Sequence, residues 1–329
     1  MEPTTKETQG EQPDVQRGRA VTLYPAELLS YSTVRLVCEG PNESSYGTGF
    51  FYSIPVGTDA THYKPVIVSN RHVSEGAMKT HFALVSGASI STSHTESYQV
   101  VIDHAHIPWI NHPDPSVDLS ILPITSQLEH MRKQGQTPFF YPLTPSLIPD
   151  DEYLKSVTQT DEVIMIGYPG ALWDEVNNQP IFRKGTLATS PAKAFRGRHE
   201  FLIDMPVFRG SSGSPVLLFS DSMYFDRKDG ARIMGNRLKL LGINAGTYQS
   251  TVTGKVVPVP VPTVVEEKQN HTSGVNSDTN RISQKFSLGT QMEIPNNIGI
   301  IIHASRLKEF EDYLFNTPNR SADQERPVR

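Results

Sequence analysis

Residues 208–216, with the sequence FRGSSGSPV, form a Gly/Ser-rich turn on which the interpretation of the whole chain depends. The turn lies between two apolar runs, residues 200–205 and 216–219, which we expect to be strands. Such a turn can present the hydroxyl of Ser212 in a cleft, while the backbone N–H groups of Gly210 and Ser212 hold a developing oxyanion. Taken alone the turn is ambiguous, because Gly/Ser-rich turns that join strands are common.

Two upstream stretches supply the groups that would activate a serine, which is a weak nucleophile without a base and an orienting carboxylate. The apolar run at 65–69 (PVIVS) leads into His72, and Asp118 stands at the head of a second apolar run, LSILPI at 119–124. The candidates therefore follow in the order His72, Asp118, Ser212. Their separations are 118 − 72 = 46 and 212 − 118 = 94 residues.

These three stretches together resemble the trypsin-fold serine peptidases of the PA clan, and most closely the HtrA-type and glutamyl-endopeptidase (V8-like) branches. The segments TGFF at 48–51, IDMPVFR at 203–209 and GYP at 167–169 are similar to the same branches. The resemblance covers about residues 31–316. It implies an all-β fold of two six-stranded antiparallel β-barrels with a C-terminal helix.

The same resemblance, together with composition, predicts the organisation of the chain. Residues 1–20 are rich in Glu, Gln, Thr and Pro, so we expect a disordered tail there. The peptidase domain is expected at 21–316 and a second tail at 317–329. Within the domain we expect an N-terminal barrel at about 31–125, a C-terminal barrel at about 159–303 and the terminal helix at about 304–316.

The function that the resemblance implies is a serine endopeptidase that works through an acyl-enzyme. Ser212 would attack the peptide carbonyl, His72 would carry the proton, and Asp118 would orient the imidazole. The backbone N–H groups of Gly210 and Ser212 would form the oxyanion hole. A catalytically silent interaction module on the same fold stays open as the alternative, whereas a redox or metal hydrolase lacks paired thiols and a ligand pattern.

Matching by the turn, the resemblance also implies a substrate-binding pocket with Pro206 and Val207 at its floor and Asn244, Ala245 and Gly246 on its wall. None of these residues is acidic, so cleavage after Lys or Arg is not expected. A small or medium apolar residue is predicted at the cleaved bond. The glutamyl branch has a histidine where this chain has Asn244, which argues against glutamate specificity.

Composition limits the partners and the location. The 329 residues carry a formal net charge of -5, with no basic excess to suggest a nucleic-acid partner. No run reaches membrane-spanning length, and the polar N-terminus lacks the apolar region of a signal peptide. We therefore expect a cytoplasmic protein without cofactor, metal or membrane partner, acting on a peptide or protein substrate.

The last expectation concerns how the peptidase activity would be regulated. Ser211 stands where digestive trypsins have the aspartate that receives the new N-terminus, so zymogen cleavage of that kind is not expected. Residues 256–287 first alternate valine with proline and then become polar. This segment is either an inert insertion or a gate beside the cleft that could involve a regulatory protein partner, and the sequence leaves both open.

Overall fold

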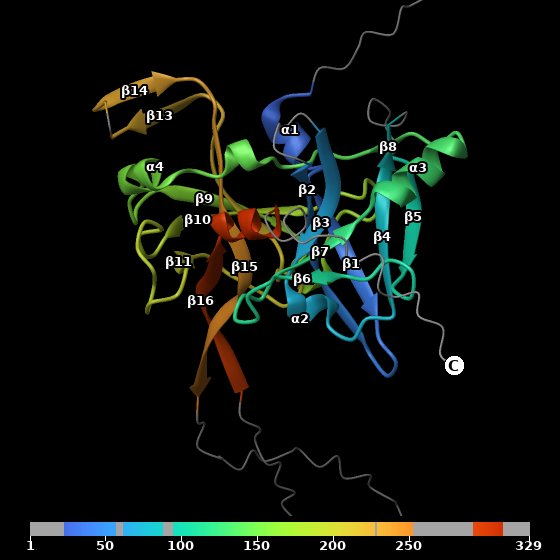
Figure 1. The fold of residues 1–329 in the computed structure, drawn as a ribbon. Coiled ribbons are helices and arrows are strands. Elements are labelled where there is room, and N and C mark those ends of the chain that lie inside the picture. Colours follow the sequence, from blue (N-terminus) through green and yellow to red (C-terminus); the bar gives the residue numbers. More distant parts are fainter. Residues whose placement is uncertain (1–22, 57–61, 88–94, 228, 253–291, 312–329) are drawn as a thin grey trace, which may run out of the picture.

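The computed structural model describes residues 23–56, 62–87, 95–227, 229–252 and 292–311, which form two β-rich lobes that pack side by side (Figure 1). The predicted tails at 1–20 and 317–329 lie outside the described residues. The segment at 256–287, expected to be either an inert insertion or a gate, also lies outside them, as do residues 312–316 of the predicted terminal helix.

The first lobe is a sheet of eight strands in the described part of the chain. Its order is β5-β4-β1-β2-β3-β7-β6, with β8 paired to β4. Short helices α1 (Pro25–Leu29), α2 (Arg71–Ser74) and α3 (Thr125–Lys133) flank it. The strands are β1 (Thr33–Glu39), β2 (Ser44–Val56), β3 (His62–Ser69), β4 (Lys79–Ser86), β5 (Ser97–Asp103), β6 (Ile110–Asn111), β7 (Ser120–Pro123) and β8 (Pro138–Phe139).

A closed barrel of six antiparallel strands, in the order β10-β11-β16-β15-β12-β9, makes up the second lobe. A hairpin, β13 (Met223–Asp226) with β14 (Ala231–Met234), stands at its margin near α4 (Asp151–Ser156) (Figure 1). The barrel strands are β9 (Glu162–Gly167), β10 (Ile181–Leu187), β11 (Glu200–Asp204), β12 (Pro215–Ser220), β15 (Arg237–Val252) and β16 (Met292–His303). One of the two predicted six-stranded barrels is thus confirmed.

The predicted closure of the first lobe into a six-stranded barrel is not confirmed. In the described residues β5 and β6 end the sheet at opposite edges, and β8 adds to β4 instead of closing the ring. The alternation of apolar residues fixes which face of a strand is buried, but it does not fix which strands become neighbours. The strand pattern was therefore right, and closure was an inference from the resemblance alone.

Alternating burial accounts for the cores of both lobes. In β1, Val34, Leu36 and Cys38 face the interior of the first lobe. A third core lies between the lobes and contains Phe50 from β2 and Leu217 from β12. The two halves of the chain thus share one apolar interface, and a site built across it is held as firmly as the core itself.

The chain after β16 is helical as far as it is described. A 3-10 turn, η4 (Ala304–Leu307), is followed by α-helical residues 308–311, with Leu307 and Phe310 buried in the core between the lobes. The predicted terminal helix at about 304–316 stays a prediction, because residues 304–307 form a 3-10 turn and only 308–311 of the described residues are α-helical.

His303, the last residue of β16, is a buried histidine whose environment favours the neutral ring. Its Nδ1 accepts the backbone N–H of Ser305 at 3.2 Å and lies 2.8 Å from the Ser305 hydroxyl. Burial, and after it the positive charge of His199, lowers the pKa of His303 to about 4. The folded protein therefore binds this proton less readily than the unfolded chain, in which histidine titrates near 6.5.

We expect this histidine to make the protein sensitive to acid. The stabilising contribution is fully present above about pH 6.5 and is lost as the pH falls toward 4, with a cost of roughly 3 kcal/mol. Urea unfolding measured between pH 7 and pH 4.5 tests this, because His303→Asn should flatten the decline. The exposed His130, replaced by Asn, is the matched control and should leave the decline unchanged. An equal decline in the His303 variant would contradict the assignment.

Candidate active site

Strand pairing brings His72 and Asp118 together. Strand β3 runs antiparallel to β7 with Ser69 opposite Ser120. The end of β3 therefore meets the start of β7, so that His72 in helix α2 and Asp118 just before β7 are neighbours although 46 residues separate them in sequence.

The two side chains form a short, doubly anchored pair. His72 Nδ1 lies 2.6 Å from Asp118 Oδ2, and the backbone N–H of His72 donates to Asp118 Oδ1 at 2.9 Å. Since an ionised carboxylate only accepts hydrogen bonds, the imidazole carries its proton on Nδ1 and leaves Nε2 able to accept one. The His72 side chain is 47% exposed and that of Asp118 29%, so the imidazole is open to solvent.

Neighbouring residues fix this pair in place. Asn70, which is fully buried, donates from Nδ2 to the Asp118 carbonyl at 2.8 Å. Arg71 donates from Nη1 to the Pro115 carbonyl at 2.9 Å. Asn70 and Arg71 therefore hold the segment that carries Asp118 at two positions, the carbonyls of Asp118 and Pro115.

Ser212 lies in the loop between β11 and β12 of the second lobe, and strand β2 of the first lobe holds this loop. The backbone N–H of Thr48 donates to the Ser212 carbonyl at 2.8 Å, and the Thr48 hydroxyl donates to the Gly210 carbonyl at 2.8 Å. Ser69, at the end of β3, donates to the Thr48 carbonyl at 2.8 Å. The strand that leads to His72 and the loop of Ser212 are thus linked through a single residue, Thr48.

Two glycines in the loop are required by its backbone. Gly210 and Gly213 both have a φ of 86°, in the region that favours glycine. A Cβ at Gly210 would collide with the Tyr168 carbonyl, and one at Gly213 with the Thr48 carbonyl. Gly213 is therefore required by the close approach of the two lobes, and Gly210 by the close approach of the segment after β9 within the second lobe.

The backbone N–H groups of the loop fall into two kinds. Those of Ser211, Gly213 and Ser214 donate to the carbonyls of Phe208, Asn244 and Ser211, at 3.0, 2.9 and 3.1 Å. Those of Gly210 and Ser212 donate to no backbone carbonyl among the described residues. The N–H groups without a backbone acceptor are therefore those of Gly210 and Ser212, the pair expected to form an oxyanion hole.

Gly47 marks where the Ser212 loop borders helix α2. A Cβ at Gly47 would lie 2.6 Å from Cγ1 of Val73, the residue after His72, and 3.3 Å from the Ser212 carbonyl oxygen. No hydrogen bond within the described residues joins the Ser212 hydroxyl to the His72 imidazole. The structure therefore pairs His72 with Asp118 and brings the Ser212 loop against the helix that carries His72.

The predicted pocket residues occupy different environments. Val207 is buried and Pro206 exposed, with the Pro206 carbonyl accepting a hydrogen bond from Arg183. Asn244 is fully buried, and its Nδ2 donates to the Ser211 carbonyl at 2.9 Å, so its side chain braces the serine loop. Ala245 packs at the edge of the core between the lobes, and Gly246 has a φ of 159°.

Sequence reasoning assigned no role to Thr48 or Arg183, although both contact the serine loop. The guanidinium of Arg183 lies 4.7 Å from the centre of the Phe208 ring, in the same loop. The sequence offers one signal for Thr48, which stands between two glycines, Gly47 and Gly49. Glycines on both sides of a hydroxyl residue allow another backbone to approach it closely. No comparable signal marks Arg183, whose partners lie more than twenty residues away.

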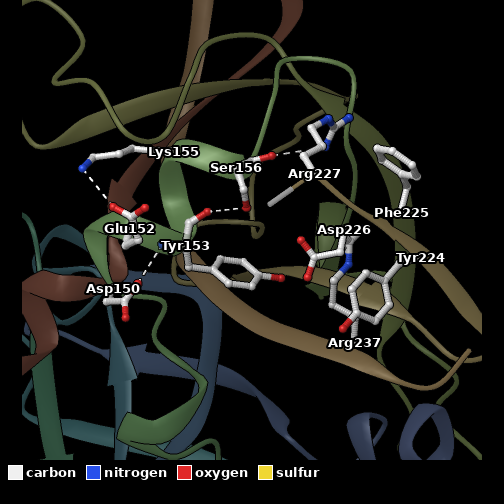
Figure 2. A pocket seen from close by; sticks show the side chains of 10 residues that line it. All are labelled: Asp150, Glu152, Tyr153, Lys155, Ser156, Tyr224, Phe225, Asp226, Arg227 and Arg237. Carbon is white, nitrogen blue, oxygen red and sulfur yellow. Dashed lines mark hydrogen bonds and ion pairs between the residues drawn. The ribbon is translucent and has the colours of Figure 1, made fainter. Parts of the chain in front are cut away.

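A cavity of about 430 Å³ lies elsewhere, between α4, β13 and the start of β15 (Figure 2). Tyr153 extends into it from α4 and faces Asp226 and Arg237, and Arg227 at its rim contacts the Ser156 carbonyl at 3.3 Å. None of the predicted site residues lines it.

Among the described residues no three or more His, Cys, Asp or Glu side chains are grouped to hold a metal ion. No helix in the described part of the chain is long and apolar enough to cross a membrane.

Comparison with known proteins gives the family. The profile described as "Trypsin-like peptidase domain" matches residues 47–222, more than half of the 329-residue chain. The protein belongs to this family of trypsin-like peptidase domains. No curated protein matches the chain.

Three solved structures are similar in part. The serine endoprotease from Yersinia pestis is 15% identical, with 67% of this chain and 55% of that chain covered and a TM-score of 0.37. The HtrA-type protease AlgW with tripeptide is 14% identical, with 87% and 60% covered and a TM-score of 0.44. The active form of the Rv3671c protease from M. tuberculosis is 14% identical, with 96% of each chain covered and a TM-score of 0.39. The chain thus spans less than two thirds of the first two proteins.

Proposed function

We propose that the protein is a serine endopeptidase that hydrolyses peptide bonds through an acyl-enzyme, with His72, Asp118 and Ser212 as its triad. The observation that carries the proposal is the His72–Asp118 pair, in which one carboxylate accepts both the Nδ1 proton at 2.6 Å and the backbone N–H of the same histidine at 2.9 Å. This arrangement leaves Nε2 as the base and prepares Asp118 to stabilise the imidazolium that forms when the base is protonated.

In the proposed reaction the Ser212 hydroxyl attacks the carbonyl carbon while His72 Nε2 takes its proton. The tetrahedral intermediate collapses as His72 returns the proton to the leaving amine, and an ester on Ser212 remains. Water, activated by the same imidazole, then hydrolyses the ester. No cofactor is needed at any step.

The oxyanion hole of this proposal consists of the backbone N–H groups of Gly210 and Ser212. Support comes from the loop, where these two donors are uncommitted among the described residues while their neighbours are hydrogen-bonded. Donors that are held in place before the reaction stabilise the developing charge without reorganising. Loss of one such donor costs about 100- to 1,000-fold in kcat.

The alternative is a silent interaction module on the same fold. A fluorophosphonate probe separates the two, because only an activated serine is labelled. Mass spectrometry should find the probe on Ser212 in the wild type and find no adduct in Ser212→Ala or His72→Ala. A wild type that is not labelled at Ser212 would favour the silent module.

The proposed substrate is a peptide or protein with a small or medium apolar residue at the cleaved bond. The side chains assigned to the pocket, Pro206, Val207, Asn244 and Ala245, carry no charge that could pair with Lys or Arg. Digestion of an unbiased peptide library should give kcat/KM values at least about tenfold higher after Val or Ala than after Arg, since one buried apolar contact is worth about 1–3 kcal/mol. Preferred cleavage after Arg or Glu would overturn this assignment of the pocket. A cytoplasmic location and a regulatory partner remain predictions.

A further inference from the structure

Asp118 lies at the end of a loop, residues 112–119, that joins β6 to β7. The carboxylate of Asp114 organises this loop, because its Oδ1 accepts the backbone N–H and the hydroxyl of Ser116 at 2.9 and 2.7 Å. The Val117 N–H donates to the Asp114 carbonyl at 3.1 Å. Whatever holds Asp114 therefore holds the turn that ends at Asp118.

The second oxygen of Asp114 is held from the other end of the chain. Arg306, in η4 after the barrel, donates from Nη2 to Asp114 Oδ2 at 2.7 Å and from Nη1 to Glu309 Oε1 at 2.8 Å. The Ser116 hydrogen bonds, and after them Arg306, lower the pKa of Asp114 from its ordinary value. The Arg306 side chain is 15% exposed and that of Asp114 42%, so only the guanidinium end of the pair is shielded from solvent.

His112 adds a second link between the same two segments. Its Nδ1 accepts the backbone N–H of Asp114 at 3.1 Å, so Nε2 carries the proton and donates to the Arg306 carbonyl at 3.1 Å. The fully buried imidazole packs edge-on against Phe310, with ring centres 5.0 Å apart. Loop 112–119 and helical residues 304–311 therefore form one packed unit.

From these contacts we infer that Arg306 is a positioning residue for the proposed triad, and this inference rests on the proposed function. Arg306 does not touch the reacting atoms. It holds Asp114, Asp114 holds the turn, and the turn sets the carboxylate of Asp118 against His72. On the opposite side Arg71, next to His72, holds the Pro115 carbonyl of the same loop at 2.9 Å. The loop is thus clamped between the histidine helix and the terminal helix.

Replacement of Arg306 should lower kcat while KM changes little, because the substrate pocket lies in other segments. We expect Arg306→Ala to lower kcat about 10- to 100-fold, since small displacements of catalytic groups cost this much. Arg306→Lys keeps one cation but cannot bridge both Asp114 and Glu309, so kcat should be intermediate. Asp114→Asn should lose as much as Arg306→Ala, and the double variant should lose no more than either single variant, because both break one link.

Two further measurements separate positioning from general destabilisation. A cavity of about 250 Å³ lies beside Arg306, Asp114 and Val117, so millimolar methylguanidine should enter Arg306→Ala and restore part of kcat. The downfield ¹H NMR signal of the His72 Nδ1–H should broaden or shift in Arg306→Ala and return with methylguanidine. The matched control is Arg227→Ala, at a residue that lines the cavity in Figure 2; it removes an ion pair of the same 2.7 Å length, to Asp161. This control should leave kcat and the NMR signal unchanged.

The inference is overturned if folded Arg306→Ala, with wild-type circular dichroism, keeps the wild-type kcat and the same His72 signal. It is also overturned if Arg227→Ala loses as much kcat as Arg306→Ala. A wild type that neither hydrolyses peptides nor takes up fluorophosphonate would refute the proposed function instead. The His72 signal in Arg306→Ala would then decide alone whether Arg306 positions the pair.

Discussion

Ser212→Ala should abolish peptide hydrolysis and leave the fold intact. If Ser212, His72 and Asp118 act as a unit, removal of the nucleophile removes nearly all that the unit contributes, and kcat should fall by about a millionfold. The Ser212 hydroxyl makes no hydrogen bond to a described residue, so the melting temperature should change little. Burst and steady-state kinetics on a cleaved library peptide, with thermal unfolding of the same preparation, measure both quantities.

The neighbouring serine provides the matched control. Ser211 is buried, and its hydroxyl has no hydrogen-bond partner among the described residues, so Ser211→Ala removes one oxygen from the same loop without breaking a bond. We expect kcat within about threefold of the wild type, because the Ser211 hydroxyl forms no hydrogen bond within the described residues that could position the loop. Full activity in Ser212→Ala, or a millionfold loss in Ser211→Ala, would show that the nucleophile has been assigned to the wrong residue.

Asp118→Asn should have the next largest effect, a fall in kcat of about 10,000-fold. Asparagine can still accept the His72 backbone N–H through its oxygen, so the geometry should survive. Its amide group, however, would face His72 Nδ1 as a donor. The imidazole must then carry its proton on Nε2, where it can no longer accept one from Ser212.

An aspartate elsewhere in the same lobe serves as the comparison for this substitution. Asp103, at the end of β5, accepts the backbone N–H of Ala105 at 2.9 Å and has no contact with His72. Asp103→Asn removes the same charge from the lobe and should leave kcat within about twofold, since exposed charges are strongly screened. If both variants lose activity equally, net charge rather than tautomer control is the cause, and the proposed role of Asp118 fails.

Much of the candidate site could be predicted because each part lies within a short, self-contained stretch. An apolar run at 65–69 ends shortly before His72 and another begins directly after Asp118, and such runs are the sequence signature of buried strands. The pairing of β3 with β7, which brings both residues together, does not follow from these runs and was implied by the resemblance alone. The Ser212 loop could be predicted from a short stretch as well, because its glycines stand within four residues of each other.

The remaining features depend on contacts between distant parts of the chain. Thr48 bonds to Gly210 across 162 residues and Arg306 to Asp114 across 192 residues, and no local pattern reports either partner. Strands β6 and β8 have two residues each, too few for an alternating pattern. In β10, the Asp204 carbonyl of β11 comes so close to Gly185 that a side chain would not fit, and the sequence around Gly185 does not report this contact.

The bonds of Thr48 across the two lobes have a consequence for protein synthesis. A ribosome adds about 5–20 residues per second, so the first lobe emerges several seconds before the loop of Ser212 exists. Helical residues 304–311, whose Phe310 packs on His112, emerge later still. A nascent chain therefore carries an imidazole and a carboxylate without a nucleophile, and the proposed peptidase activity appears only after residues 304–311 have been made. The order of the chain would thus delay the proposed hydrolysis until both lobes have folded.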